Sequence, residues 1–260
     1  MVDVSEFPVT ATGTSVQILE TLIERNGAGV TEIADVLDRS KSSVHNHLET
    51  LTGLGFVIKD GYDYRVSLRF LTIGSYARSQ YPLYAAGVSE VAQLSTASGC
   101  SAGLAVLEGD SVVCLHHRLG PDTDTPRVEA GDRLPLDCTA AGKAILAALG
   151  EARRDELLAG HTFDSGTGQS HSSRSELDAE LGTVRTRGLA VDREEWYPDQ
   201  RGIAAAVEGV DGELRGAIYL LTATEGLSGK RFQQDLPGLV ISSANSIRNT
   251  LRESETGCRE

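Results

Sequence analysis

The segment from residue 31 to residue 55 constrains the fold of this 260-residue chain most, because it predicts two short helices joined by a tight turn. The second helix begins after Ser40, whose hydroxyl oxygen can accept a hydrogen bond from a free N–H of the first turn. Its apolar residues recur with the spacing of one helical face, at Val44, Leu48 and Leu51. Polar side chains then point outward, and such a helix is suited to enter the major groove of DNA.

Seven residues in and beyond this helix are candidate DNA contacts. Hydroxyl and amide side chains can hydrogen-bond to phosphates or base edges, and an asparagine can contact N6 and N7 of adenine together. Basic side chains would hold the phosphate backbone. The predicted DNA-binding residues are Lys41, Ser42, Ser43, His45, Asn46, Lys59 and Arg65.

Two flanking features complete a winged helix-turn-helix domain, which we place at residues 10–67. Residues 14–26 carry an apolar helical face that ends at a glycine. Two short apolar-polar runs flank Asp60-Gly61, which is a strong signal for a β-hairpin. The alternative left open is a helix-turn-helix module that senses a metabolite or docks proteins without sequence-specific DNA binding.

The charge of the chain opposes DNA binding at low salt. It has 37 Asp and Glu against 24 Lys and Arg, a formal net charge of −13. We interpret the excess as adaptation to a salty, halophilic cytoplasm, where carboxylates keep proteins dispersed and salt screens repulsion from phosphates. The competing interpretation is that the chain does not bind DNA.

The sequence also bears on compartment and cofactors. No run of 18 apolar residues is present, and the N-terminus lacks the apolar segment of a signal peptide, so we predict a cytoplasmic protein with no membrane partner. The four cysteines lack the spacing of a zinc site, and no catalytic fingerprint occurs. We therefore predict no metal, no cofactor and no catalytic residues, with a hydrolase as a remote alternative.

Beyond residue 98 short strands and helices are mixed without strict alternation. This pattern predicts an α+β fold class with an antiparallel sheet over residues 98–252, able to enclose a small molecule. Residues 68–97 predict a connecting helix broken near Tyr81-Pro82, either a dimer contact or an ordinary packing helix, and residues 253–260 form a polar tail. The predicted strands are 101–107, 112–116, 189–192, 203–207 and 214–222, and the predicted helices are 139–149, 173–187 and 236–252.

Three stretches together resemble the IclR family of transcription regulators, over about residues 14 to 252. They are TEIADVLDRSKSSVHNHLETLTGLGFV, LPLDCTAAGKAILAAL and VRTRGLAVDREEWYPDQRGIAAAVEGVDGELRGAIYL. The resemblance implies an N-terminal winged helix domain and a C-terminal GAF-like effector domain. It also implies a homodimer or homotetramer whose affinity for a double-stranded DNA operator is controlled by a small-molecule effector.

The resemblance further implies an effector pocket, carried over position by position. Its residues are Ala140, Ala141, Asp192, Gly202, Tyr219 and Leu221. This chain has Gly202 and Leu221 where family members that bind small oxoacids have polar side chains. The effector is therefore expected to differ, or the pocket to be vestigial. The family often has a basic residue at Asn46, so the operator sequence does not carry over.

Several polar residues allow two interpretations. Lys143 could attract an anionic ligand, but we interpret it as a surface residue of its helix. Asp192 is either a pocket acceptor or the cap of a turn. His161 and His171 border a Gly/Ser-rich segment, expected to be a solvated surface loop rather than a lid. The cysteines and histidines between residues 100 and 138 could form a metal site, although buried core is favoured.

Overall fold

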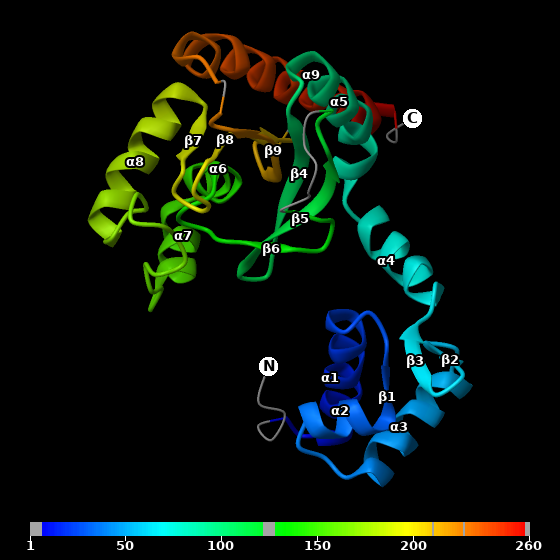
Figure 1. Cartoon of the computed structure of the whole chain (residues 1–260). Coiled ribbons are helices and arrows are strands. Elements are labelled where there is room, and N and C mark those ends of the chain that lie inside the picture. Colours follow the sequence, from blue (N-terminus) through cyan, green and yellow to red (C-terminus); the bar gives the residue numbers. More distant parts are fainter. Residues whose placement is uncertain (1–6, 122–127, 210, 226, 258–260) are drawn as a thin grey trace. The chain divides into compact units, whose positions relative to one another are not determined.

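The computed structural model describes residues 7–121, 128–209, 211–225 and 227–257. The chain divides into two compact units, Met1–Ala77 and Arg78–Glu260, and each has its own apolar core (Figure 1). Within the described ranges, no helix is both long enough and apolar enough to cross a membrane.

The N-terminal unit packs helices against a small antiparallel sheet of strand order β1-β3-β2. The buried apolar face of α3 meets side chains such as Ile18, Leu22 and Ile33 from the two preceding helices. The elements are α1 (Thr10–Glu24), β1 (Ala28–Gly29), α2 (Val30–Val36), α3 (Lys41–Gly53), β2 (Val57–Asp60) and β3 (Asp63–Val66), followed by α4 (Arg69–Ser79).

Local signals in the sequence set the ends of α3. The hydroxyl oxygen of Ser40 accepts a hydrogen bond from the backbone N–H of Ser43 at 3.2 Å, which confirms the predicted cap. At the other end Gly55 has φ +77°, and the N–H of Phe56 returns to the carbonyl of Leu51 at 2.8 Å. This return bond is the Schellman motif, which glycine permits because it lacks a Cβ.

The predicted hairpin is also confirmed. Strands β2 and β3 pair antiparallel, with Asp60 opposite Asp63 as the last pair before the turn. Gly61, with φ +62°, is the first of the two loop residues, and this conformation favours glycine. The hairpin therefore forms the wing that the sequence predicts.

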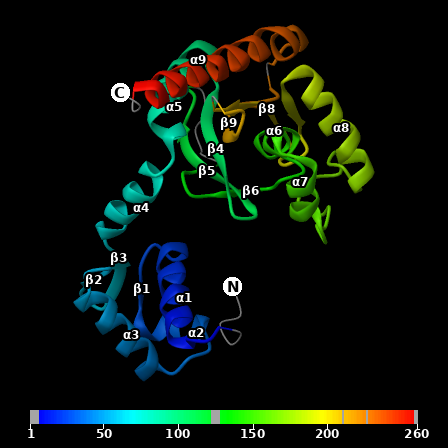
Figure 2. The same ribbon diagram turned by 180° about the vertical axis from the view of Figure 1, so that it is seen from behind.

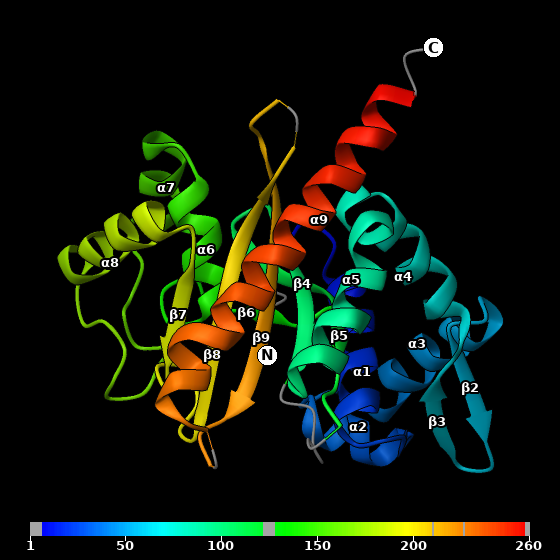
Figure 3. The ribbon, with the colours of Figure 1, turned by 90° about the horizontal axis from the view of Figure 1, so that it is seen from above.

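The C-terminal unit is a sheet of order β6-β5-β4-β9-β8-β7, in which every neighbouring pair of strands is antiparallel. Its helices cover both faces of the sheet (Figures 2 and 3). Its elements are α5 (Pro82–Ser98), β4 (Ser101–Glu108), β5 (Ser111–Arg118), β6 (Arg133–Leu134), α6 (Ala140–Ala148), α7 (Glu151–Leu158), α8 (Arg174–Arg187), β7 (Ala190–Arg193), β8 (Gln200–Glu208), β9 (Leu214–Ala223), the π-helical turn η2 (Arg231–Asp235) and α9 (Leu236–Gly257).

Alternate residues of each strand enter separate apolar cores on the two faces of this sheet. Helices α6, α7 and α8 pack on one face with residues such as Ala204 and Ala217. Helices α5 and α9 pack on the other face with residues such as Ile203 and Ile218. The mixed helix-and-sheet fold class predicted from the sequence is confirmed, and the face that carries α6 holds the candidate effector residues.

The structure adds detail that the sequence pattern lacked. The connecting segment is two helices, α4 and α5, and the break predicted near Tyr81-Pro82 falls between them, with Pro82 in the first turn of α5. The short strands β1 and β6, the helix α7 and the turn η2 were not predicted. Strands β1 and β6 have only two residues each, too few for an alternating pattern to be recognised.

Candidate functional site

The outward face of α3 is polar and accessible. Lys41, Ser42, His45 and Asn46 are exposed, and Ser43 is half-buried beside the cap. Asn46 lies two residues after the buried Val44, so its side chain leaves the helix on nearly the opposite side. The polar ridge predicted to read DNA therefore stands clear of the core of its own unit.

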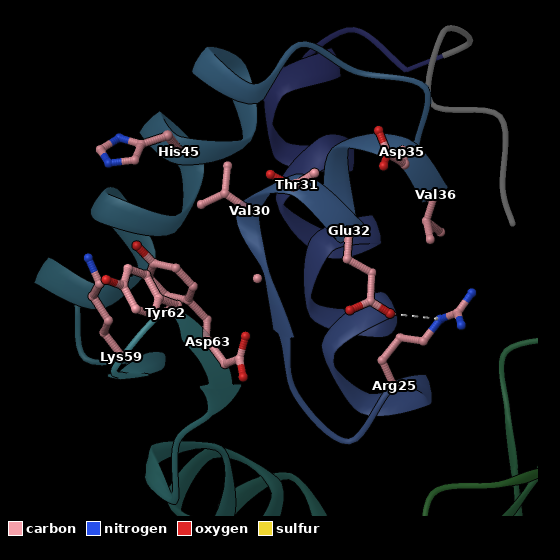
Figure 4. A pocket seen from close by; sticks show the side chains of 12 residues that line it. Arg25, Val30, Thr31, Glu32, Asp35, Val36, His45, Lys59, Tyr62 and Asp63 are labelled. Atoms are coloured by element: carbon pink, nitrogen blue, oxygen red, sulfur yellow. Dashed lines mark ion pairs between the residues drawn. The ribbon is translucent and has the colours of Figure 1, made fainter.

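Carboxylates lie close to one side of this ridge. His45 Nε2 lies 3.9 Å from Glu49 Oε1 on the same helix. A hollow of about 670 Å³ lies between α2, α3 and the hairpin, and Figure 4 shows His45 and Lys59 at its edge with Glu32, Asp35 and Asp63. Arg25 and Glu32, which also line the hollow, form an ion pair at 3.8 Å. Acidic groups so close to the predicted DNA contacts would repel phosphates when salt is low.

The two basic residues of the wing lie on opposite faces of the hairpin. Lys59 is opposite the buried Tyr64, and its Nζ lies 5.4 Å from the centre of that ring. Arg65 is opposite Ile58, on the other face. The prediction grouped Lys59 and Arg65 as phosphate contacts, and this arrangement means that they would reach different phosphates.

Sequence analysis missed two accessible side chains near the DNA-binding candidates. Tyr62, at the tip of the hairpin, is 95% exposed. Arg39 is exposed in the turn that precedes Ser40. Their position was the available signal, because the tip of a wing and the turn before a recognition helix both lie close to DNA in winged helix proteins.

Four of the predicted effector residues meet in the C-terminal unit. Asp192, Gly202 and Leu221 are neighbours across β7, β8 and β9. A Cβ built on Gly202 would lie 3.2 Å from Ala140 Cβ and 3.3 Å from Asp192 Cβ. The first turn of α6 is therefore close to these strands, and the glycine leaves room beside the carboxylate. Ala141 is buried one residue further along α6.

Tyr219 belongs to a separate polar cluster on the same face of the sheet. Its hydroxyl lies 3.2 Å from Cys114 Sγ and 3.0 Å from His117 Nδ1, and its ring stacks on that of His117. Gly103 has no side chain because a Cβ there would collide with the Tyr219 ring. Burial raises the pKa of Cys114 to about 11 and lowers that of His117 to about 4, so the cluster is neutral near pH 7.

The metal alternative finds no geometric support. Among the residues that the structure describes, no group of three or more His, Cys, Asp and Glu side chains is placed to hold a metal ion. Cys100, Cys114 and Cys138 are free and buried.

The interpretation of Lys143 as a surface residue is wrong. Its side chain is fully buried, and Nζ donates to both carboxylate oxygens of Glu195 at 2.7 and 2.6 Å, with Glu180 Oε1 at 4.0 Å. Helix α6 is buried on every side because its small residues let it enter the unit. A Cβ at Gly142, for example, would collide with the carbonyl oxygens of residues 135 and 136.

Asp192 serves as a cap and also has a free acceptor. Its Oδ1 accepts a hydrogen bond from the backbone N–H of Glu195 at 2.7 Å, which fixes the turn that carries Glu195 to Lys143. Oδ2 is buried and has no hydrogen-bond partner among the described residues. Burial raises the pKa of Asp192 to about 7. The negative charge of Glu195 raises this pKa further, whereas the hydrogen bond from the Glu195 backbone N–H lowers it.

Asp137 is a second buried carboxylate, and sequence analysis overlooked it. It is 1% exposed, and in the described part of the chain neither of its oxygens has a hydrogen-bond partner. His161 Nε2 approaches Asp137 Oδ1 to 3.4 Å, and His171 Nε2 lies 4.0 Å from Glu195 Oε2. The loop expected to be a solvated surface loop thus directs both histidines toward buried carboxylates.

These groups form one acceptor-rich cluster around Cys138. The charges of Asp137, Asp192 and Glu195 reinforce the effect of burial and raise the pKa of the Cys138 thiol, against the opposing charge of Lys143. Carboxylates therefore outnumber the lysine in a region closed to water. Buried polar atoms without partners are rare in folded proteins, because each costs free energy. Among the described residues, Oδ2 of Asp192 and both carboxylate oxygens of Asp137 are such atoms, so they are candidates for contacts to a small molecule.

Comparison with known proteins bears on both units. The fold combines a winged helix-turn-helix with a mixed helix-and-sheet domain, which defines a class of two-domain regulators. Residues 15–61 match the family model "IclR helix-turn-helix domain", and residues 77–249 match "Bacterial transcriptional regulator IclR C-terminal". The chain belongs to the IclR family of transcriptional regulators, with a DNA-binding helix-turn-helix domain and a C-terminal effector domain.

Individual relatives agree along nearly the whole chain. The "Probable HTH-type transcriptional regulator ArcR" of Halobacterium salinarum is 29% identical and aligns over 92% of both chains. The crystal structure of Thermotoga maritima IclR has a TM-score of 0.81 at 20% identity and covers 92% of this chain and 98% of its own. An IclR homolog from Microbacterium hydrocarbonoxydans, complexed with 4-hydroxybenzoate, has a TM-score of 0.79 at 17% identity and covers 93% and 98%.

Proposed function

We propose that α3 binds in the major groove of an operator and reads base edges through Ser42, Ser43 and Asn46. Lys41, Lys59 and Arg65 would bind phosphates, and His45 would contact DNA beside Glu49. The exposed polar ridge of α3, opposite its buried face, is the observation that carries this proposal. On the outward face of α3, the side chains of the N-terminal half are mostly small and polar, which allows close approach to base pairs.

Asn46→Ala tests the base-reading role once a site has been selected from random duplexes in concentrated KCl. On the selected site the change should cost about 1–3 kcal/mol of binding free energy and relax the preference at one base pair. Asn249→Ala is the matched control, because Asn249 is exposed on α9 in the other unit. Equal weakening on every duplex would remove the base-reading role, and failure to enrich any duplex would favour the docking alternative.

The acidity of the DNA-binding unit supports a role in high salt. Residues 1–77 contain ten Asp and Glu against six Lys and Arg. We propose that the protein acts in a cytoplasm rich in potassium salts, where repulsion between these carboxylates and phosphates is screened. Both the unfolding temperature and the affinity for the selected duplex should rise between low and molar KCl. A protein that binds best at low salt would contradict this proposal.

We propose that the effector binds beside Ala140, Ala141, Asp192, Gly202 and Leu221, with Tyr219 as part of the nearby wall. Asp137 joins this set, because its two buried oxygens have no hydrogen-bond partner in the described residues. The Asp137 carboxylate accepts hydrogen bonds and repels anions, Asp192 Oδ2 is a further acceptor, and Lys143 is already paired with Glu195. The expected effector is therefore an uncharged molecule rich in hydroxyl donors, such as a polyol or a sugar, rather than an acid.

Asp137→Ala separates an effector role from a folding role. The substitution removes a buried carboxylate that has, among the described residues, no hydrogen-bond partner and only the His161 ring within ion-pair distance, at 3.4 Å, so the free energy of unfolding should stay nearly the same or rise. The effector response is measured as the increase in unfolding temperature that a compound causes. Each uncharged compound is compared with its acid, glycerol with glycerate and glucose with gluconate, and the increase should be lost in Asp137→Ala. Asp110→Ala, at an exposed turn, is the control. Loss of stability in Asp137→Ala, or a stronger response to the acids, would contradict the proposal.

We propose that the protein is a homodimer or a homotetramer that contacts its partner through α4. None of the side chains of this helix is buried, and Leu68, Leu71 and Ile73 in and beside it are 77%, 64% and 49% exposed. Leu71→Glu should lower the mass in sedimentation equilibrium, whereas Val16→Glu, at an exposed position of α1, should not. An unchanged mass for Leu71→Glu would assign the interface to another surface.

A further inference from the structure

A second concave site lies on the face of the sheet opposite the proposed effector site. It is a cavity of about 670 Å³ at the β7 edge of the sheet, between the sheet and the start of α9. It is lined by Arg187, Arg193 and Arg201 and by apolar residues such as Leu189, Val191 and Phe232. Leu189 and Val191 pack with the core under α5 and α9, whereas Asp192 lies beside α6. The two sites are thus separated by strand β7 itself.

Three arginines line this cavity in a chain whose net charge is −13. Arg193 and Arg201 are directly opposite each other on β7 and β8, and Arg187 is the last residue of α8. Like charges in directly opposed cross-strand positions destabilise a sheet unless something compensates them.

The described residues compensate only part of this charge. Glu194 Oε2 lies 3.2 Å from an Arg201 nitrogen, but no ion pair within 4.0 Å reaches the side chain of Arg187 or Arg193 in the portion of the chain that the structure describes. Arg201 Nε is buried without a hydrogen-bond partner there. The cavity therefore keeps unused donors and an excess of about two positive charges.

The rest of the wall is mostly apolar. The Arg201 guanidinium lies over the Phe232 ring, 5.3 Å from its centre, which restricts its orientation. Leu189, Val191 and Ile241 line the same space. The volume falls within the range of small-molecule sites, and arginine forks bind carboxylates and phosphates with paired hydrogen bonds.

We propose that this arginine cavity binds a small organic polyanion, a molecule with at least two carboxylate or phosphate groups, at a site distinct from the effector site. Groups of the ligand would lie between Arg193 and Arg201 and reach Arg187, where they would relieve the repulsion across β7 and β8. Carboxylate and phosphate groups both bind arginine through paired hydrogen bonds. Citrate and pyrophosphate therefore serve as the two probes.

Calorimetric titration of the full-length protein with citrate and with pyrophosphate tests the proposal. The wild type should bind at least one probe, and Arg193→Gln and Arg187→Gln should each weaken that binding by about tenfold or more. Arg185→Gln is the matched control, because it removes the same charge from the same helix but lines a different cavity. Without anion, Arg193→Gln should unfold at the same or a higher temperature than wild type, since repulsion is relieved.

Further measurements decide whether the arginine cavity binds the anion specifically. Binding that survives in Asp137→Ala would show that the anion site is independent of the proposed effector site, and loss of anion binding in that variant would contradict the inference. Equal weakening by Arg185→Gln would indicate non-specific attraction and overturn it. No heat with either probe would also overturn it, as would a lower oligomer mass in Arg193→Gln, which would make this face an interface between copies.

Discussion

Replacing Asp192 with asparagine should make the stability of the C-terminal unit less dependent on pH. The carboxyl group is 1% exposed, and burial raises its pKa from 3.8 to about 7. Asparagine keeps an oxygen that can accept the Glu195 N–H, so the turn is preserved, but its side chain cannot ionise. The substitution thus removes one titration and leaves the surrounding geometry in place.

The sign of the effect follows from the direction of the pKa shift. Because the pKa of Asp192 is higher in the folded state than in the unfolded state, the folded protein holds the proton more tightly. Its contribution to stability is fully present below about pH 4 and is lost as the pH rises to about 7. Each pKa unit is worth about 1.4 kcal/mol, so the whole contribution is about 4 kcal/mol, of which about 2.5 kcal/mol is lost between pH 5 and pH 8.

Urea unfolding at about pH 5 and about pH 8 measures this difference. Trp196 is the only tryptophan of the chain and lies four residues from Asp192, so its fluorescence reports on the C-terminal unit. Wild type should lose about 2.5 kcal/mol more than Asp192→Asn between these pH values. Parallel losses in the two proteins would refute the argument that burial keeps Asp192 protonated.

Three further substitutions test packing and capping. Lys143→Met should cost about 3–5 kcal/mol in urea unfolding, because it leaves Glu195 buried without its partner. Adding Glu195→Gln should restore most of that loss. A double variant that is no more stable than Lys143→Met would contradict the pairing. Gly103→Ala should cost about 1–3 kcal/mol, since the new methyl group must displace the Tyr219 ring, and an unchanged melting temperature would count against this packing. Ser40→Ala should lower the stability of the N-terminal unit by about 1 kcal/mol in thermal unfolding followed by circular dichroism, whereas Ser42→Ala, two residues later and exposed, should not.

Local signals made most of the secondary structure predictable. Ser40 and Gly55 mark the ends of α3, and Asp60-Gly61 marks the hairpin, because caps and turns depend on residues only a few positions apart. The spacing of Val44, Leu48 and Leu51 identified the buried face of α3, and all three are buried. These features follow from backbone geometry and do not require knowledge of the tertiary fold.

The polar cluster of the C-terminal unit could not be predicted in the same way. Lys143 and Glu195 are 52 residues apart, and nothing near Lys143 in the sequence shows that α6 is surrounded on all sides. Asp137 follows an apolar residue in a short connection, where a carboxylate usually reaches water. The resemblance to a family identified Ala140, Asp192, Gly202 and Leu221 as neighbours, and the sheet register places them together, but it did not indicate Asp137.

The buried ion pair between Lys143 and Glu195 should constrain how the two positions change during evolution. Loss of either Lys143 or Glu195 alone leaves the other charge buried and unpaired. A lineage that loses one partner therefore passes through a form that folds poorly. Divergent descendants should accordingly retain both residues or exchange both for neutral ones, and mixed genotypes should be scarce. Two motifs far apart along the gene are in this way inherited as a unit.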